Sequence, residues 1–496
     1  MNKKEKSQKI QDIYSLTPLQ EGMLYHYNSQ PDSTGYILQS VYDIDFELHE
    51  DMLGNAIKLL AARYDVLRTT ILYEKVKTPR QVVLKEKPVE CITTDCTEHK
   101  TEEIPEIVSK IVRKDLLRGF NLQKDSLIRF TYIKCPDKKS KLLFSIHHII
   151  IDGWCNKLLL NKLMEYYSLL VGGVSFDNAL KMVAKERAGK SEYKDYINWI
   201  QKNDAKKALN YWRNLLDDFQ GANKIMPLEK PERCREQNVE ISCELDKEVS
   251  SQLMSITREM NVTINTVMET LVGILVQKST GDNDAVMGKV VSGRDANIPG
   301  IESIIGLFIN TIPLRVNNSD DLTFKTLVMN QNQQAVESSE FSYCSLGEIQ
   351  NLTVQKRDLI NILFVFENYD SFGSSSSASA SGGESSIADE YSREQTNYDL
   401  TITACSNDTN ILVNFDYLTD KYSRSDIQLL IDRLKKICEA VAQNHDIKIS
   451  DIDCLTDGEK EKILNDFNLN GQEVPHLLGG GMNCPSAARL TFSLTI

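Results

Sequence analysis

The chain has 496 residues, which exceeds one ordinary hydrophobic core and favours two or three domains. Its apolar and charged fractions are typical of a globular protein, and a net charge of −13 without a basic patch argues against a nucleic-acid-binding protein. No run approaches the about 18 apolar residues of a membrane-spanning helix, and no apolar segment follows the N-terminal lysines. We therefore expect a cytoplasmic protein with neither a nucleic-acid nor a membrane partner.

The cysteines indicate neither a disulfide framework nor a metal site. There are eleven, an odd number, and they are scattered without a Cys-x-x-Cys pair or a histidine spacing that would complete a zinc site. We expect reduced thiols and no bound metal.

Predicted strands and helices alternate in the first third of the chain. In order, we predict strands at 10–15 and 34–47, a helix from Glu50 to Arg63, strands from Val66 to Tyr73 and from Gln81 to Leu84, a helix from Thr101 to Leu117 and a strand from Leu127 to Lys134. This alternation indicates an α/β (α+β) fold, but the connections are too irregular for a doubly wound parallel sheet.

Two of the seven histidines, His147 and His148, stand side by side at the end of a predicted strand that includes Lys141 to Ile146. An amphipathic helix is predicted from Gly153 to Val171, so the pair lies on a turn between a strand and a helix. Imidazole has the unperturbed pKa nearest neutrality, which makes this a suitable place for a proton-transfer group. A partly buried, hydrogen-bonded histidine pair is the alternative.

Asp152 lies four residues after His148 and has two possible roles. It could fold back beneath the His148 ring, or it could pair with a cation and hold the turn. A carboxylate paired with arginine has a lowered pKa and is a poor base at neutral pH, which favours the second role. Cys155 is either a candidate nucleophile or a small packing residue at the start of the helix.

The second half of the chain continues the mixed pattern. We predict a helix that opens at Ser191 to Trp199 and runs through Trp212, helices from Lys247 to Met260 and from Ile264 to Val276, a strand from Asp284 to Val291, ordered segments at Thr396 to Leu400 and Ile411 to Leu418, and a last helix from a capping-box spacing at Ser425 to about Gln443. Ser371 to Ser386 is rich in serine and glycine and cannot bury enough apolar surface to fold, so we expect a flexible loop there.

The pattern His-His-x-x-x-Asp-Gly at 147–153 resembles the central motif of condensation domains of non-ribosomal peptide synthetases, in the chloramphenicol acetyltransferase-like superfamily. Other segments resemble further motifs of that family and follow in its order: Leu16 to His26, Arg63 to Thr70, Ser191 to Trp199, Val290 to Arg294, Ile305 to Arg315 and Phe364 to Tyr369. The resemblance covers residues 10 to 468 and implies two acetyltransferase-like lobes in a V-shaped pseudo-dimer with a central tunnel.

The resemblance also implies an organisation of the chain. It places an acceptor docking segment at 1–15, an N-terminal lobe at 16–175, and a C-terminal lobe at 176–455 that contains a flexible loop at 371–389. Residues 456–496 then contain the remnant of a linker to an adenylation domain and an aberrant tail.

The implied reaction joins substrates held on two carrier domains, whose phosphopantetheine arms enter opposite ends of the tunnel. The acceptor amine attacks the donor thioester, and His148 orients that amine and accepts its proton. His147 has a structural or tuning role, the Gly153 N–H lies near the oxyanion, and Arg294 pairs with Asp152. Trp154, Ser292 and Asn310 are expected to line the tunnel. No cofactor is bound by the chain itself, because the carriers supply the phosphopantetheine.

Three alternatives remain within this resemblance: a coenzyme-A-dependent acyltransferase, an epimerisation-type domain, and a non-catalytic recruitment domain or inactive fragment. Recruitment domains of this kind typically lose the second histidine, and His148 is present, which favours activity. The first two motifs and Asp152 to Cys155 resemble domains that begin a protein and join a D-configured donor to an L-configured acceptor. We therefore expect an upstream synthetase to dock in trans, with Lys3, Lys4, Lys6 and Lys9 complementing an acidic helix on it.

Overall fold

The structure is a computed structural model and describes residues 9–30, 34–221, 223–227, 238–318, 321–368, 387–393, 396, 398–407 and 410–469. The chain divides into two units between Cys454 and Leu455. In the second unit, Thr456 caps α14 (Asp457–Leu469) by accepting a hydrogen bond from the Glu459 N–H at 3.2 Å. All other elements belong to the first unit. Within the ranges given, no helix is long and apolar enough to cross a membrane.

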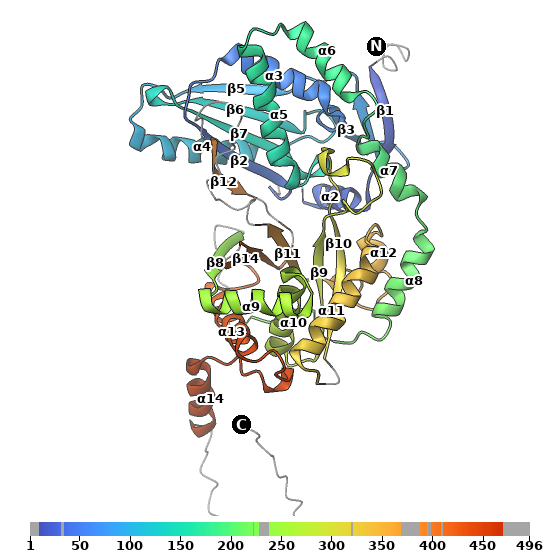
Figure 1. The fold of residues 1–496 in the computed structure, drawn as a ribbon, viewed down its shortest axis with the longest axis vertical. Helices are drawn as coiled ribbons and strands as arrows, with labels where there is room; N and C mark the ends of the chain where they lie inside the picture. The colour runs from blue at the N-terminus through green and yellow to red at the C-terminus, as the bar shows by residue number, and fades with distance from the viewer. Residues whose placement is uncertain are drawn as a thin grey trace, which may run out of the picture. The chain divides into compact units, whose positions relative to one another are not determined.

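A five-stranded mixed sheet has the order β12-β2-β7-β6-β5 (Figure 1). Its strands are β2 (Ile37–Ile44), β5 (Glu90–Asp95), β6 (Ile128–Lys134), β7 (Ser140–His147) and β12 (Ile387–Arg393), and only β5 and β6 are parallel neighbours. Successive side chains of a strand face opposite sides of a sheet. Phe144 therefore packs in the core with α3 (Glu50–Arg63) and α5 (Trp154–Val171), whereas Leu143 packs against α4 (Ile104–Arg118).

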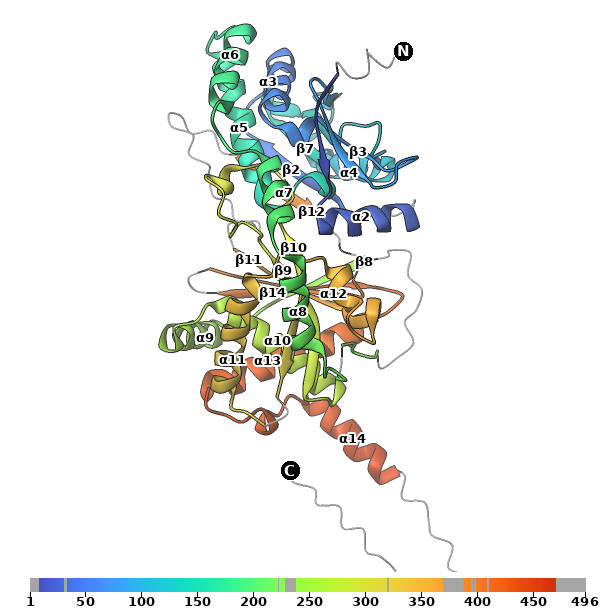
Figure 2. The same cartoon turned by 90° about the vertical axis from the view of Figure 1, so that its right-hand side faces the viewer.

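A six-stranded mixed sheet has the order β10-β9-β11-β13-β14-β8. Its strands are β8 (Asn238–Glu244), β9 (Asp284–Val291), β10 (Asn310–Asn317), β11 (Ile362–Asn368), β13 (Leu400–Ser406) and β14 (Ile411–Leu418). Strand β11 is parallel to both of its neighbours, and the other pairs are antiparallel. Its helices α9 (Lys247–Met260), α10 (Ile264–Thr280), α11 (Phe324–Ser339) and α13 (Arg424–Gln443) gather on one face, with α10 largely buried (Figure 2).

A small antiparallel sheet, β1-β4-β3, contains part of the predicted docking segment. Strand β1 (Ile10–Ser15) pairs with β4 (Arg80–Leu84), which also pairs with β3 (Thr69–Leu72). Residues 10–15 are therefore an integral strand of the first unit. Of the predicted docking segment, only residues 1–8 lie outside the described part of the chain.

Several predicted elements have different boundaries in the structure. Residues 66–68 belong to a 3₁₀ turn, Asp65–Arg68, which precedes β3 and in which the Asp65 carboxylate bonds Arg68. The helix predicted to run through Trp212 is two helices, α7 (Tyr193–Lys202) and α8 (Ala205–Leu216), because the Asp204 side chain accepts from two N–H groups and starts the second. Helix α13 is capped by Ser423, not by the predicted Ser425.

Helices α11 and α14 were not among the sequence predictions, and neither were α2 (Pro18–Ser29), α6 (Phe176–Arg187) and α12 (Leu346–Gln350). Helix α6 packs on α3 and α5, and residues of α7 share their core, so the packing of the first lobe extends past the predicted boundary at residue 175. Strand β12 also crosses the predicted division, because it pairs with the outer edge of β2 in both views (Figures 1 and 2). Unpaired strand edges expose N–H and C=O groups, and β12 satisfies those of β2.

The predicted flexible loop at 371–389 is wrong at its end, since Ile387 to Asp389 lie in β12. Residues 371–386 lie outside the described part of the chain, as do Tyr369 of the last family-like segment and the predicted tail from residue 470 onwards.

Candidate active site

The histidine pair lies where the sequence places it, at the end of a strand and before a helix. His147 is the last residue of β7 and pairs with Ile37 of β2, and His148 opens a 3₁₀ turn, His148–Ile150, that leads to α5. Both side chains are buried, each 3% exposed. The His148 N–H donates to the carbonyl of Tyr36 at 2.7 Å, so the turn is tied to the segment before β2.

The ring of His147 is held as a neutral imidazole. Its Nδ1 accepts a hydrogen bond from the Ile149 N–H at 3.1 Å, so the proton of the neutral ring is on Nε2. Burial, with a smaller contribution from His148, lowers the pKa of His147 to about 3. The ring is therefore uncharged at neutral pH and is a poor proton acceptor there.

The ring of His148 has the opposite tautomer. Its Nδ1 lies 2.6 Å from the carbonyl oxygen of Ile151, and because a carbonyl can only accept, Nδ1 carries the proton. The lone pair of the neutral ring is then on Nε2. A histidine whose Nδ1–H is fixed by a backbone carbonyl is oriented to accept a proton at Nε2.

The Asp152 carboxylate forms its bonds with Arg294 and Phe308 and not with the histidines. This is the second of its two possible roles, in which it pairs with a cation and holds the turn. Its Oδ1 lies 3.2 Å from Nη2 of Arg294, and its Oδ2 accepts from the Phe308 N–H at 2.9 Å. The side chain is 1% exposed. The carboxylate therefore joins the turn after His148 to two distant segments of the chain.

Arg294 is anchored on several sides. Its Nη1 donates to the carbonyls of Ile301 and Ile304 at 2.8 and 3.0 Å, and its guanidinium lies 4.2 Å from the centre of the Phe308 ring. The preceding Gly293 has φ +65°, and a Cβ there would lie 2.0 Å from the Phe308 carbonyl oxygen, so this approach requires glycine.

Cys155 is a packing residue of this cluster. Its thiol is fully buried and lies 3.2 Å from Oδ1 of Asp152 and 3.3 Å from the carbonyl oxygen of Gly306. Burial, reinforced by the charge of Asp152, raises the pKa of the thiol far above its ordinary value. A nucleophile needs an accessible thiolate, so the packing alternative for Cys155 holds.

The other predicted site residues have diverse surroundings. Gly153 has helical φ and ψ at the start of α5. Trp154 is 53% exposed and donates its Nε1–H to the Glu302 carbonyl at 3.0 Å. The Ser292 hydroxyl accepts from the Arg294 N–H at 3.3 Å. The buried Asn310 amide donates to the carbonyls of Ser342 and Cys344 at 2.7 and 2.8 Å, which makes it a brace between segments.

Two buried glutamines that sequence reasoning did not single out hold the histidine turn. Gln20 Nε2 donates to the Ile149 carbonyl at 2.7 Å, and Gln20 and Gln81 exchange side-chain amide hydrogen bonds at 3.1 and 2.8 Å. Gln20 Oε1 also accepts from the Thr17 N–H at 2.8 Å, which closes a capping box at the start of α2. The capping-box spacing from Thr17 was the available signal, but it indicates only a helix start.

Tyr193 and Tyr196, whose segment resembles a family motif, support the same cluster. Their hydroxyls donate to the carbonyls of Leu307 and Phe308 at 2.6 and 3.0 Å. Both side chains are buried. They are core aromatics, and they also fix the segment whose N–H contacts Asp152.

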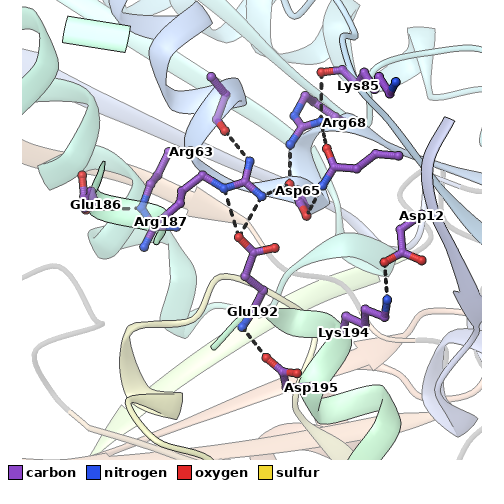
Figure 3. Close-up of polar contacts among 12 residues, drawn as sticks. Asp12, Arg63, Asp65, Arg68, Lys85, Glu186, Arg187, Glu192, Lys194 and Asp195 are labelled. Atoms are coloured by element: carbon purple, nitrogen blue, oxygen red, sulfur yellow. Dashed lines mark hydrogen bonds and ion pairs between the residues drawn. The ribbon is translucent and has the colours of Figure 1, made fainter. Parts of the chain in front are cut away.

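A charged network on the other side of α7 joins the second family-like segment to α6. The Arg187 Nη2 lies 2.7 Å from Asp65 and 2.8 Å from Glu192, so one guanidinium bridges two carboxylates (Figure 3). Burial and a hydrogen bond to Asp65 raise the pKa of Glu192 to about 7. Nearby, Glu186 bonds Arg63 at 3.3 Å. These residues order the start of α7 and do not contact the histidines directly in any described hydrogen bond or ion pair.

The residues described here contain no group of three or more histidine, cysteine, aspartate or glutamate side chains that could hold a metal ion.

Comparisons with known proteins point to one family. The condensation-domain family model matches residues 10–464. The chain is 33% identical over 475 residues to gramicidin S synthase 2 of Brevibacillus brevis, which covers 95% of this chain and 10% of that protein. It is 33% identical over 476 residues to tyrocidine synthase 3 of Brevibacillus parabrevis, which covers 95% of this chain and 7% of that protein. The chain thus spans only a small part of the length of these relatives.

Solved structures support the fold. A four-domain nonribosomal peptide synthetase bound to AMP and glycine matches with a TM-score of 0.73 and 17% identity over 91% of this chain and 34% of that chain. The first condensation domain of the calcium-dependent antibiotic synthetase, in complex with a substrate analogue, matches with a TM-score of 0.69 and 18% identity over 90% of this chain and 100% of that chain. The mixed α/β fold is therefore the chloramphenicol acetyltransferase-like fold of these domains. The chain belongs to the condensation-domain family of nonribosomal peptide synthetases, whose members form amide bonds between carrier-bound substrates.

Proposed function

We propose that this chain joins a carrier-bound donor thioester to the α-amine of a carrier-bound aminoacyl acceptor, and that His148 accepts the proton that the amine loses. The observation that carries the proposal is the 2.6 Å contact between His148 Nδ1 and the Ile151 carbonyl oxygen. It leaves Nε2 as the basic nitrogen of the neutral ring. Family membership and the order of the motifs support the same reaction.

The chemistry needs modest help from a base. An α-amino group has a pKa of about 7.7 to 8.0, so much of the acceptor amine is already neutral, and holding it against the thioester supplies a large part of the acceleration. As the C–N bond forms, nitrogen becomes cationic, and His148 Nε2 takes its proton. The C–S bond then breaks, and the proton passes to the departing pantetheine thiolate. Atoms and charges therefore balance without any further reagent.

The neighbours of His148 have supporting roles in this proposal. Asp152 and Arg294 position the turn and take no part in proton transfer. The Gly153 N–H stands at the start of α5, where the helix dipole favours negative charge, and we assign it to the developing oxyanion. Trp154, Ser292 and Asn310 remain proposed residues of the channel that the substrates follow. His147 has a structural role, because its Nδ1 accepts from the Ile149 N–H within the same turn.

The partners in this proposal are an upstream and a downstream peptidyl carrier, each with a phosphopantetheine arm. We further propose that residues 1–8 dock an upstream synthetase, and that the preferred donor has the D configuration and the acceptor the L configuration, as the resemblance of the first motifs suggests. A cytoplasmic location is part of the proposal, and the nine cysteines of the described ranges, all free thiols, support it.

The decisive experiment incubates the chain with a donor carrier and an acceptor carrier that have been chemically loaded, followed by mass spectrometry of the acceptor arm. A dipeptidyl thioester that disappears with His148→Asn supports the proposal. An epimerised donor without a new bond would indicate an epimerisation-type activity, and acyl transfer from coenzyme A alone would indicate the acyltransferase alternative. No reaction with any partner would indicate a recruitment role.

Donor stereochemistry needs a separate competition between D- and L-aminoacyl donors on the same carrier. Inverting the α-carbon exchanges a side chain and a hydrogen, so a site shaped for one hand misplaces the carbonyl of the other. We expect the D-donor to dominate the product. Equal rates, or a preference for the L-donor, would reject the subtype while leaving the condensation reaction standing.

A further inference from the structure

Tyr36, which immediately precedes β2, has a left-handed backbone with φ +63°. Residues other than glycine, asparagine and aspartate rarely adopt this conformation, because their Cβ atom crowds the backbone. A bulky residue keeps such a strained backbone only where the surrounding structure holds it, and strain of this kind is concentrated at functional sites. The position of Tyr36 relative to the histidine turn is therefore informative.

The carbonyl of Tyr36 accepts the backbone N–H of His148 at 2.7 Å. Strands β2 and β7 pair Ile37 with His147, so Tyr36 lies opposite His148 in the same register. The carbonyl of His148, by contrast, accepts the Ile151 N–H at 3.2 Å inside the turn. The contact with Tyr36 thus extends the strand pairing by one residue, into the turn that contains the proposed base.

Two backbone contacts fix the histidine pair from opposite sides. His147 donates its N–H to the Leu127 carbonyl at 2.9 Å, next to β6, and His148 donates to Tyr36, next to β2. The ring of His148 is also bound to the backbone, through Nδ1 and the carbonyl of Ile151. Because the ring and the backbone of His148 are held together in this way, a rotation of the Tyr36 carbonyl would move Nε2 of His148.

The ring of Tyr36 has contacts of its own. It is half-buried against the core, and its centre lies 6.1 Å from the ring centre of His26 on α2. This packing can help to hold the left-handed backbone in place. The backbone and the ring of Tyr36 are therefore two separate candidates for an effect on His148.

We propose that Tyr36 is a positioning residue for the condensation reaction, and that its left-handed backbone, not its ring, directs the carbonyl that holds the His148 N–H. The proposal rests on the proposed function, in which Nε2 of His148 is the base. A residue that positions the base acts on the chemical step and leaves substrate binding unchanged. Misplacement of a reacting group by about 1 Å can lower the rate by about 10²-fold.

Four variants of Tyr36 separate the backbone from the ring. Tyr36→Gly and Tyr36→Asn both lose the ring but tolerate a positive φ. Tyr36→Ala loses the ring and disfavours a positive φ, and Tyr36→Val, with its branched Cβ, disfavours it most. Lys75→Val is the matched control, because Lys75 has φ +59° in the exposed turn between β3 and β4.

The first measurement is kcat and KM on loaded carriers. We expect Tyr36→Gly and Tyr36→Asn to keep the kcat of wild type, and Tyr36→Val to lose about 10- to 100-fold in kcat with an unchanged KM. Tyr36→Ala should lie between them. Lys75→Val should lower the unfolding midpoint and leave kcat unchanged. If Tyr36→Val does not fold, the comparison of Tyr36→Ala with Tyr36→Gly decides, since the two differ only in Cβ.

Two kinetic outcomes would overturn the proposal. An equal loss of kcat in all four Tyr36 variants would assign the effect to the ring. Wild-type kcat in both Tyr36→Val and Tyr36→Ala would show that the left-handed backbone is dispensable for the chemical step.

The second measurement is the amide hydrogen exchange of His148, followed by NMR in a sample labelled only at its seven histidines. The His148 N–H should be protected in wild type, Tyr36→Gly and Tyr36→Asn, and should lose protection in Tyr36→Val. Equal protection in all variants would contradict the role of the left-handed backbone. Absence of product with the wild-type chain would instead contradict the proposed function, on which the exchange rates do not depend.

Discussion

Arg294 and Asp152 are ion paired across 142 positions of the chain, with Nη2 3.2 Å from Oδ1 and side chains that are 6% and 1% exposed. A buried pair of this kind is a poor source of net stability, since both charges lose hydration, but removal of one partner leaves the other buried and uncompensated. The pair connects the turn after His148 to the segment of residues 301–308. The side chains of Arg294 and Asp152 also form hydrogen bonds with backbone groups of that segment.

The first prediction concerns this pair. Asp152→Ala and Arg294→Ala should each lower the free energy of unfolding by about 3 to 5 kcal/mol and also lower activity. The double variant should lose less than the sum, with a coupling of about 0.5 to 3 kcal/mol, measured by urea unfolding. Lys110→Ala, which breaks an exposed pair with Glu106, should leave the unfolding midpoint unchanged. Strict additivity of the two buried changes would mean that the pair is not energetically coupled.

The second prediction separates the two nitrogens of His148. Because the side chain is buried and bonds Ile151, His148→Ala should lower stability by about 0.5 to 1.5 kcal/mol in addition to abolishing activity. His148→Asn, with an amide N–H near the Nδ1 position, should recover most of that stability but remain about 10²- to 10⁴-fold slower than wild type. Thermal unfolding and single-turnover assays on loaded carriers measure the two effects. An active His148→Asn chain would contradict the role of Nε2 as the base.

The third prediction assigns Gln20 a positioning role. Gln20→Ala removes the contact with the Ile149 carbonyl and leaves the Gln81 amide partly unpaired, so stability should fall by about 1 to 3 kcal/mol. The expected kinetic signature is a lower kcat with an unchanged KM, because Gln20 holds the catalytic turn and does not touch substrate. Gln20→Glu keeps an acceptor for the Thr17 N–H but lacks the donor, and should show the same kinetic defect. The matched control is Gln333→Ala, on an exposed helix face, which should be neutral.

If Gln20→Glu had normal kcat, the contact with Ile149 would be dispensable for catalysis. If KM rose and kcat did not change, Gln20 would act on substrate binding and not on the turn.

The sequence predicts the position of the histidines well because that position is a local property. The patterns that predict the strand, the turn and the helix around the histidines all lie within about 30 consecutive residues. The same holds for α3, α9 and β9, whose predicted bounds agree closely with the structure. The family resemblance adds the pairing of Asp152 with Arg294, which no local pattern indicates.

The remaining parts of the site depend on long-range contacts. Gln20 meets Ile149 across 129 positions, and Tyr193 meets Leu307 across 114, so neither partner can be inferred from spacing. The tautomers of His147 and His148 depend on which backbone group lies beside each ring nitrogen, a matter of turn geometry. Strand β12 could not be predicted from the sequence for a related reason, because its partner strand, β2, is far away along the chain.

The fourth prediction uses the two glutamates of the charged network in Figure 3, which have opposite pKa shifts. Burial and the hydrogen bond to Asp65 raise the pKa of Glu192 from 4.5 to about 7. Burial also acts to raise the pKa of Glu186, but bonds from Lys162, Tyr166 and Arg63 outweigh it and hold that pKa below its ordinary value. The two residues should therefore respond to pH in different windows.

For Glu192, the folded chain binds more protons than the unfolded chain between pH 4.5 and about 7, so stability falls as pH rises through this window. The Tm of wild type relative to Glu192→Gln, measured by calorimetry, should decrease from pH 5 to pH 8, since the variant cannot ionise. Glu186 is ionised in both states over that range and contributes stability that is lost only as pH falls below its unfolded value, so the difference between wild type and Glu186→Gln should be flat. If the Tm difference for Glu192→Gln were also flat, Arg187 would compensate the carboxylates of Asp65 and Glu192 fully. If that difference rose with pH, the shift in the pKa of Glu192 would have the opposite sign.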